Sequence, residues 1–452
     1  MIWLYSLIAQ GEALEIPHET FTLDNGLQVI LIEDHTLPQV VVNTWYGVGS
    51  FDDPPGASGF AHLFEHLMFM GTTVIPNKEF DVRMEVAGGW NNASTADDRT
   101  NYYDVGGSGL VDLLLFMEAD RMVNLDITQE KLNLQRDVVR NERRQNYEDA
   151  PYGGIWLEVP KMMYPSDHPY HLEGIGSHED LLAATLKTVN NFYNTWYQPA
   201  NASLCVAGDF DPIVVKQKIQ EYYGGIQAKQ ASTHAQISLP TKPEMAEHTM
   251  YDKVPLPAMM MMWHSPVIFE QGDAEADVLA SLLAGRADAV LTQKLVYDQQ
   301  LVQDVSVYQY SRGRGSMFFV YVDALENTDL QAVRTMILEE LQKVAEGKTE
   351  IDTGDLEAIV NNIEMGVLWS LEDIQEKAEI LQKYRHYKGT PDYLTQDIQR
   401  YKDVTPAGIQ SMMQQYITAD KVSTLYVFPQ PEDSEEESGS TEDSDNQEGG
   451  AQ

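Results

Sequence analysis

The sequence predicts an α+β fold of two similar αβ domains, each a mainly antiparallel sheet flanked by helices that pack on one side of it. The chain has 452 residues, which suits two or three domains at roughly 150 residues each. Strand-like alternation and the 3.6-residue period of helices follow one another in a similar order in both halves. A stretch without apolar periodicity, residues 226–244, separates the halves and is predicted to be a linker.

The first half opens with strand signals. Residues 21–23, the turn Asp24-Asn25-Gly26 and the alternating run 27–32 predict a hairpin, and residues 40–45 predict a third strand. Residues 91–105 have strand character as well. The domain is therefore expected to begin as an antiparallel sheet.

Helical segments lie between and after these strands. One helix is expected to begin after Ser58, a residue type typical of N-caps, and to stop at Gly71. Helical periodicity returns at residues 110–122 and at about 128–147.

The first half closes with a strand and a helix. Residues 202–207 form an apolar run that contains Cys205, the only cysteine, which we expect to be a buried strand residue rather than a reactive thiol. Asp211-Pro212 have the residue types of a cap and a first helical position, and that helix should end before Gly224-Gly225. The first domain is predicted to span residues 18–225.

The second half, residues 245–430, repeats this order in outline, which suggests a duplication. Its predicted strands are 259–263, 305–310, 317–322 and 422–428, and its first predicted helices are 273–284 and 291–297, followed by long helices.

The two ends of the chain differ from the domains. Residues 1–17 contain a short apolar stretch without a basic start, so they are either a truncated export signal or an arm that packs on the body. An exported protein would be periplasmic or secreted, and otherwise it would be cytoplasmic. Residues 431–452 are acidic and almost free of apolar side chains, which predicts a disordered tail.

The charge balance limits the partners. The chain has 30 Lys and Arg against 70 Asp and Glu, a formal net charge of −40, which argues against nucleic acid and anionic membranes as partners. This negative charge suits basic substrates, although an acidic surface more often serves to keep a protein soluble. No segment reaches the roughly 18 uninterrupted apolar residues of a membrane helix, so no integral membrane segment is expected.

The stretch Gly59 to Met68 contains His62, Glu65 and His66 in the order H-x-x-E-H. Two histidines four residues apart project from one face of a helix, so their ring nitrogens can hold one tetrahedral metal ion. A hydrolytic zinc site needs a third protein ligand and an open position, and Glu142 is the candidate. Zinc would lower the pKa of a bound water towards about 7, and Glu65 would be the general base. The pattern predicts one Zn²⁺ per chain and peptide hydrolysis without a covalent intermediate.

The same residues could serve the structure alone, in either of two ways. Histidines and a glutamate on an apolar helix can be satisfied core residues, although the ordered H-x-x-E-H set arises by accident in only about one percent of chains this long. A purely structural zinc site would close its fourth position with a protein ligand and would need no general base.

The sequence resembles the insulinase/pitrilysin family of zinc metallopeptidases, in particular its short two-domain bacterial members. The family motif is an inverted H-x-x-E-H followed roughly 75 positions later by a ligand glutamate, and Glu142 follows His66 by 76 positions. The resemblance covers about residues 20–430 and implies the fold of the mitochondrial processing peptidases. The further motifs that carry it are Gly88 to Thr95, Thr100 to Tyr103, His168-Pro169-Tyr170 with Gly174, and Tyr197 to Asn201.

In the family, an edge strand pairs with extended substrate. Asn92, Ala93 and Ser94 are therefore the candidates for substrate binding, since strand addition holds a peptide by its main chain. The alternative is an ordinary edge strand without a ligand.

The sequence departs from the family pattern in two ways. Gln135 stands where a second glutamate is common, so it is expected to lie in the second shell of the metal and to leave the tuning of the site in doubt. Tyr297 and about Gln303 stand where many relatives have an arginine and a tyrosine that reach the scissile carbonyl, and that pair is missing.

The resemblance implies a zinc-dependent endopeptidase subunit that hydrolyses peptides or unfolded polypeptides. Short family members assemble as homodimers or heterodimers, so a related partner subunit is expected to supply the Arg/Tyr pair. The alternative is a non-catalytic assembly subunit of a peptidase-like complex, a class in which the H-x-x-E-H set is usually degraded.

Overall fold

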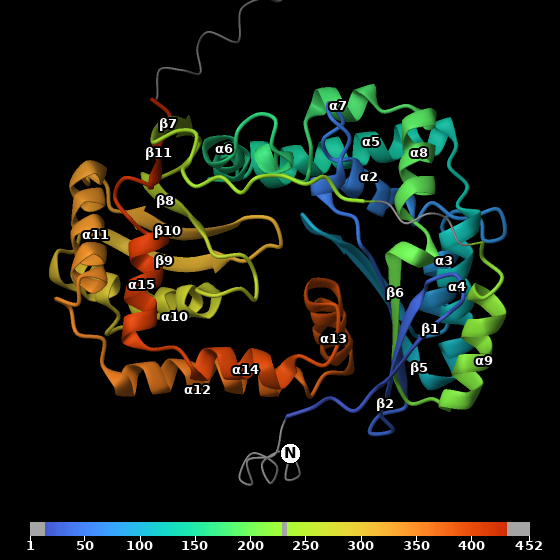
Figure 1. Cartoon of the computed structure of the whole chain (residues 1–452). Coiled ribbons are helices and arrows are strands. Elements are labelled where there is room, and N and C mark those ends of the chain that lie inside the picture. The colour runs from blue at the N-terminus through green and yellow to red at the C-terminus, as the bar shows by residue number, and fades with distance from the viewer. Residues whose placement is uncertain (1–13, 228–232, 432–452) are drawn as a thin grey trace, which may run out of the picture.

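A computed structural model of the chain describes residues 14–227 and 233–431. It shows two αβ halves side by side, each built around one sheet, with further helices between them (Figure 1). Between Tyr223 and Glu247 the described residues form no helix or strand. This two-domain α+β architecture was predicted from the sequence.

The first sheet has six strands in the order β1-β2-β6-β3-β5-β4. β2 and β6 are parallel, and every other neighbouring pair is antiparallel, including the predicted β1–β2 hairpin. The strands are β1 (Glu19–Thr22), β2 (Gln28–Glu33), β3 (Gln39–Tyr46), β4 (Trp90–Thr95), β5 (Thr100–Gly107) and β6 (Ala202–Gly208).

The second sheet has five strands in the order β7-β11-β8-β10-β9. Leaving β1 aside, both sheets follow the same path: first, fifth, second, fourth and third strand, with the first and fifth parallel. The two halves therefore repeat one strand order, as the sequence predicted in outline. The strands are β7 (Glu247–Asp252), β8 (Ala258–Ser265), β9 (Val302–Tyr310), β10 (Ser316–Ala324) and β11 (Ser423–Pro429).

Four α-helices of the first half, α5, α7, α8 and α9, begin at a residue whose side chain caps the first turn. Asp211 accepts hydrogen bonds from the N–H groups of Ile213 and Val214 and starts α9, as its sequence predicted. The α-helices are α2 (Phe60–Leu67), α3 (Glu79–Val86), α4 (Val111–Asn124), α5 (Gln129–Arg143), α6 (Gly154–Met163), α7 (His178–Ala183), α8 (Leu186–Trp196) and α9 (Pro212–Tyr223).

Aspartates cap three helices of the second half: Asp329, Asp352 and Asp373 each accept hydrogen bonds from the first turn. The α-helices are α10 (Asp273–Leu283), α11 (Leu330–Ala345), α12 (Thr353–Ser370), α13 (Ile374–Lys388), α14 (Leu394–Lys402) and α15 (Pro406–Tyr416).

Helices cover both faces of each sheet. One face packs on helices of the same half, and the other face packs on a helix from the other half of the chain. One face of the first sheet packs on helices of its own half, such as α4 and α9. The opposite face packs on α13, in a core that joins Cys205 and Val41 to Leu381 and Tyr384. In return, α6 of the first half covers β8 and β11 of the second sheet. The expectation that helices pack on one side only was wrong, because the halves exchange helices across their interface.

Several local predictions need correction. Gly59, not Ser58, is the N-cap of α2, and the Ser58 hydroxyl donates instead to Asp180 at 2.6 Å. The segment 91–105 is a hairpin of two strands, because residues 96–99 turn the chain back. The predicted helix at 291–297 is a π-helix, Thr292–Asp298, and α5 is likewise followed by a π-helical turn, Arg144–Glu148.

The ends of the chain are described only in part. The proposed signal or arm lies mostly outside the described residues, but Ile16 is buried among residues of α13 and α14. All but the first residue of the predicted acidic tail also lies outside them. In the described part of the chain, no helix combines the length and apolarity needed to cross a membrane.

Candidate metal centre

Helix α2 carries His62, Glu65 and His66. Its apolar residues, including Leu63 and Phe64, are buried in the core of the first half, and on the less buried face His62 lines a pocket. Gly59 starts the helix at φ 83°, and a Cβ there would lie 2.7 Å from the carbonyl oxygen of Ile175, so both backbone and space require glycine.

Helix α5 brings Glu142 opposite α2. Three arginines on this helix bind the segment 176–184: Arg143 donates to the carbonyl of Gly176 at 2.6 Å, Arg140 contacts the ring of His178 at 3.2 Å, and Arg136 donates to the carbonyl of Leu182 at 3.1 Å. Because Asp180 in the same segment holds Ser58 just before α2, the segment ties the two ligand-bearing helices together.

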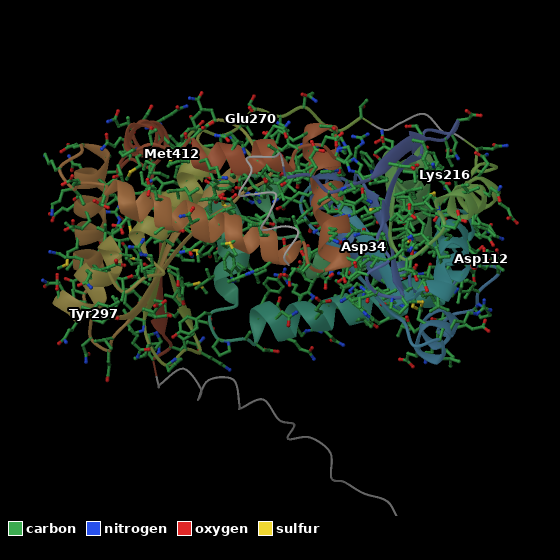
Figure 2. The ribbon with its side chains drawn as sticks, turned by 90° about the horizontal axis from the view of Figure 1, so that it is seen from below. Asp34, Asp112, Lys216, Glu270, Tyr297 and Met412 are labelled. Atoms are coloured by element: carbon green, nitrogen blue, oxygen red, sulfur yellow. The ribbon has the colours of Figure 1, made fainter. Side chains whose placement is uncertain are left out.

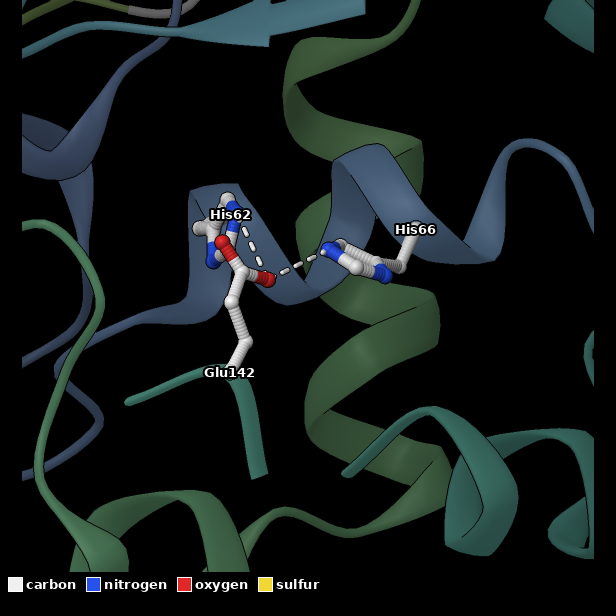
Figure 3. Close-up of side chains that lie close together, drawn as sticks. All are labelled: His62, His66 and Glu142. Carbon is white, nitrogen blue, oxygen red and sulfur yellow. Dashed lines mark ion pairs between the residues drawn. The ribbon is translucent and has the colours of Figure 1, made fainter. Parts of the chain in front are cut away.

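The three predicted ligands converge. One ligand atom each from His62, His66 and Glu142 lie within 4.8 Å of one another. Glu142 Oε2 is 3.8 Å from His62 Nε2 and 3.4 Å from His66 Nε2 (Figure 3). The two imidazole rings are 4.9 Å apart at 83° to each other, so both edges can face one point.

These distances fit a shared metal ion. Zinc takes nitrogen and carboxylate oxygen ligands at about 2.0–2.2 Å, so neighbouring ligand atoms of a tetrahedral site lie about 3.3 Å apart. The observed 3.4 and 3.8 Å are near that value and longer than an ordinary hydrogen bond. Two imidazoles and one carboxylate also match the donor set of hydrolytic zinc sites.

Gln135 lies beside His66, one of the three candidate ligands. Its Oε1 is 3.2 Å from His66 Nδ1, so it can accept the proton on that nitrogen and leave Nε2 free to bind a metal. His62 differs, because its buried Nδ1 has no hydrogen-bond partner among the described residues.

Burial and mutual contact shift the pKa values of the three candidate ligands. Burial, together with His66, lowers the pKa of His62 to about 4, which keeps this imidazole neutral and able to coordinate. The contact with His66 lowers the pKa of Glu142, whereas burial acts against it. Burial disfavours the charged form of His66, but its contact with Glu142 outweighs that effect and raises its pKa.

Glu65 lies next to the ligands but is not one of the clustered three. Its Oε2 accepts a 2.5 Å hydrogen bond from the hydroxyl of Thr95, at the end of β4. Burial raises the pKa of Glu65, and the Thr95 hydrogen bond opposes the rise. The sequence pattern had included Thr95 in the edge-strand motif without giving it this role.

The predicted substrate strand is an edge strand. β4 pairs with β5 on one side only, and Asn92, Ala93 and Ser94 lie in its middle. Two of its backbone groups have local partners: the Ala93 N–H donates to Asn92 Oδ1 at 2.8 Å, and Arg99 donates to the Ser94 carbonyl at 2.7 Å. A peptide that adds to this edge would compete with these contacts.

The second half also reaches this region. Tyr310, at the end of β9, lines the same pocket as His62 and Glu142, and its hydroxyl donates to Asp97 Oδ2 at 3.0 Å. Nothing in the local sequence of Tyr310 signals this position. Only the packing of the two halves brings it there.

Tyr297 and Gln303 are not part of the pocket. Tyr297 is 53% exposed and lies at the end of the molecule opposite Asp112 and Lys216 (Figure 2). Gln303 is exposed near the start of β9, whereas Tyr310 at the other end of that strand faces the metal residues.

With this geometry in hand, comparison with known proteins identifies the class. The model for insulinase (peptidase family M16) matches residues 28–153, and the model for the peptidase M16 inactive domain matches residues 183–363. The first match includes all four residues of the candidate centre. The fold and this pair of matches define an M16-type peptidase architecture, and the chain belongs to the insulinase family.

Relatives cover nearly the whole chain. The zinc protease PqqE of Helicobacter pylori is 26% identical over 91% of this chain and 93% of its own. The crystal structure of a protease from Helicobacter pylori superposes with a TM-score of 0.84, 26% identity, and coverage of 92% of this chain and all of that one. The periplasmic protease PqqL of Escherichia coli has the same fold, with a TM-score of 0.74, 18% identity, and coverage of 92% of this chain but 48% of its own.

Proposed function

We propose that this chain is a zinc-dependent endopeptidase subunit that hydrolyses peptides or unfolded polypeptides. The observation that carries the proposal is the convergence of His62, His66 and Glu142 within 4.8 Å, beside Glu65. The naming of the relative PqqE as a zinc protease supports it.

His62, His66 and Glu142 would hold one zinc ion, and the bound metal would supply a Lewis acid that polarises water and the scissile carbonyl. Glu65 would accept a proton from the attacking water and pass it to the leaving nitrogen. Thr95 holds the Glu65 carboxylate in place through its 2.5 Å hydrogen bond. Gln135 orients His66.

The edge of β4 would position the substrate by strand addition, with Asn92, Ala93 and Ser94 as its contacts. Thr95 follows directly, so a peptide on this edge would run towards Glu65. Main-chain pairing accepts many sequences, which suits unfolded substrates.

A donor for the developing oxyanion would come from a partner. Tyr297 and Gln303, which occupy the slots of the family's Arg/Tyr pair, lie outside the metal pocket and do not supply that pair. One oxyanion donor is commonly worth a factor of about 10² in rate. A related subunit, the same or different, would therefore complete the site in a dimer.

The rival function is a non-catalytic assembly subunit. The match of residues 183–363 to an inactive domain fits such a role, but that match does not include the H-x-x-E-H helix. Export of the chain to the periplasm or out of the cell is a separate question and stays a prediction.

The test measures zinc content and cleavage of a mixed peptide library by the purified chain, with and without a related Arg/Tyr-bearing subunit. We expect one zinc per chain, cleavage that Glu65→Gln abolishes without loss of zinc, and faster cleavage with the partner. Glu142→Gln should lose the metal. A chain that binds no zinc under these conditions would be an assembly subunit.

A further inference from the structure

Two neighbouring pockets share a wall beside the candidate metal centre. The first, of about 130 Å³, contains His62 and Glu142. The second, of about 230 Å³, lies between α6 of the first half and strands β9 and β10 of the second. Asp97, Glu173 and Tyr310 line both pockets. A side chain of a substrate held at the metal can therefore reach the second pocket.

Glu173 lies in this shared wall without a cationic partner. Its carboxylate makes no ion pair within 4.0 Å in the described part of the chain, and Arg312 and Arg143 attract it only from farther away. Burial, with the nearby charge of Asp97, raises the pKa of Glu173 to about 7, and the two arginines oppose the rise. A cationic ligand would favour the ionised form, which can accept about four hydrogen bonds.

The other charges in the wall offset each other. Arg312 lines the second pocket, and its Nη1 lies 3.2 Å from Asp97 Oδ2. The guanidinium also donates from Nε to the Gly315 carbonyl at 2.8 Å and lies 4.1 Å from the centre of the Tyr170 ring. Arg143, the other arginine near Glu173, pairs with Glu148 at 2.7 Å. Among the described residues that line the second pocket, Glu173 is therefore the carboxylate without an ion pair.

Aromatic rings form much of the second pocket. Tyr308 stacks on Phe319 at 5.0 Å, and Trp156 meets Phe319 edge-on at 6.0 Å. Trp156 is 39% exposed, which leaves ring surface free for a ligand. Aromatic faces attract cations, and they also cover the aliphatic stem of a long basic side chain.

We propose that the second pocket is a subsite for a lysine or arginine side chain of the peptide substrate, with Glu173 as the anionic partner of its head group. This subsite rests on the peptidase function proposed above and gives it a substrate preference. The net charge of −40 favours encounter with basic peptides. The segment that matches the inactive-domain model, residues 183–363, supplies β9 and β10 as walls of the subsite.

The first assay maps the bonds that the chain cuts in a peptide library by mass spectrometry. We expect lysine or arginine to be enriched at one fixed position within about two residues of the cut, by about tenfold or more over norleucine and citrulline. In Glu173→Gln the ratio of basic to neutral side chains at that position should fall to about one. Glu179→Gln, an exposed acid on α7 that lines neither pocket, should keep it.

The second assay does not need hydrolysis. Two peptides that differ only by arginine or citrulline at that position, or at each position in turn if no cut is found, are titrated into the Glu65→Gln chain by fluorescence anisotropy. The arginine peptide should bind about tenfold more tightly, and the additional change Glu173→Gln should remove the difference.

The two assays separate the failure of each proposal. Cleavage without a basic preference, a preference for aromatic side chains, or a preference that Glu173→Gln leaves intact would overturn the subsite and leave the peptidase standing. Tighter, Glu173-dependent binding of the arginine peptide by a chain that cleaves nothing would support the subsite and contradict the peptidase. Absence of any Glu173-dependent discrimination in both assays overturns the subsite.

Discussion

Thr95 donates a 2.5 Å hydrogen bond from its hydroxyl to the carboxylate of Glu65, although 30 positions separate the two residues. The contact joins the end of the proposed substrate strand to the proposed general base. Asp97 and Asp98, in the turn that follows Thr95 and joins β4 to β5, bind Arg312 and Arg314 of the second half. The position of the base is thus linked to the packing of both halves.

Removal of the Thr95 hydroxyl should slow catalysis. In Thr95→Val the Glu65 carboxylate loses its orienting partner, so we expect kcat to fall about tenfold with little change in KM or zinc content. Thr95→Ser keeps the hydroxyl and should retain most of the activity. Steady-state kinetics beside metal analysis test this, and equal kcat values for the three forms would contradict it.

Gln135 should tune metal affinity. Gln135→Ala removes the acceptor for His66 Nδ1, and we expect zinc to bind about 10- to 100-fold more weakly in competition with a chelator. Gln135→Glu offers a charged acceptor and should bind zinc more tightly than the natural chain. Gln129→Ala, an exposed change on the same helix, serves as the control. An unchanged affinity in Gln135→Ala would mean that the contact is incidental.

The Asp98–Arg314 pair should stabilise the contact between the halves. Asp98 is 3% exposed and also accepts hydrogen bonds from Tyr170 at 2.8 Å and from the Gly313 N–H at 2.8 Å. We expect a double-mutant cycle of Asp98→Asn and Arg314→Met to give a coupling free energy of about 1–2 kcal/mol in urea unfolding. Additive effects of the two changes would show that the pair contributes nothing of its own.

Glu379 of α13 should hold that helix on the first sheet. Its carboxylate accepts hydrogen bonds from Asn43 at 2.8 Å, Trp45 at 3.2 Å and Asn101 at 2.7 Å. Glu379→Ala leaves three donors without this acceptor, so we expect a loss of about 3 kcal/mol in the free energy of unfolding. The neighbouring exposed change Glu376→Ala should cost much less. Similar unfolding midpoints for the two variants would refute the role of Glu379.

Asp277 should make stability depend on pH. Burial and the charge of Asp273 raise its pKa to about 7, although the Tyr401 hydroxyl donates to it at 2.7 Å. A carboxyl whose folded pKa is raised favours folding fully below its unfolded pKa of about 4, and this contribution is lost as the pH rises towards 7. The free energy of unfolding should therefore fall over that window.

The matched variant for this effect is Asp277→Asn, which keeps an acceptor for Tyr401 without a titrating group. We expect its urea midpoint to change less between pH 5 and pH 8 than that of the natural chain. Asp298→Asn, at an exposed position, should follow the natural chain. If the urea midpoints of Asp277→Asn and of the natural chain changed equally with pH, Asp277 would not be the source of the pH dependence.

The order of strands and helices, and the H-x-x-E-H helix with its distant glutamate, could be predicted from sequence because they depend on local patterns. Alternation and the 3.6-residue period report which face of an element is buried. A fixed spacing of four residues places His62 and His66 on one helix face whatever surrounds them.

Only the tertiary structure decided what covers each buried face. In the structure β2, β3 and β6 bury apolar residues on both faces, and α13, from more than 150 residues away, packs on the face that the sequence analysis left uncovered. For the same reason the bond from Thr95 to Glu65 and the wall formed by Glu173 and Tyr310 carried no local signal. Periodicity in the sequence predicts that a side chain is buried. Which residues that side chain contacts depends on how the whole chain packs.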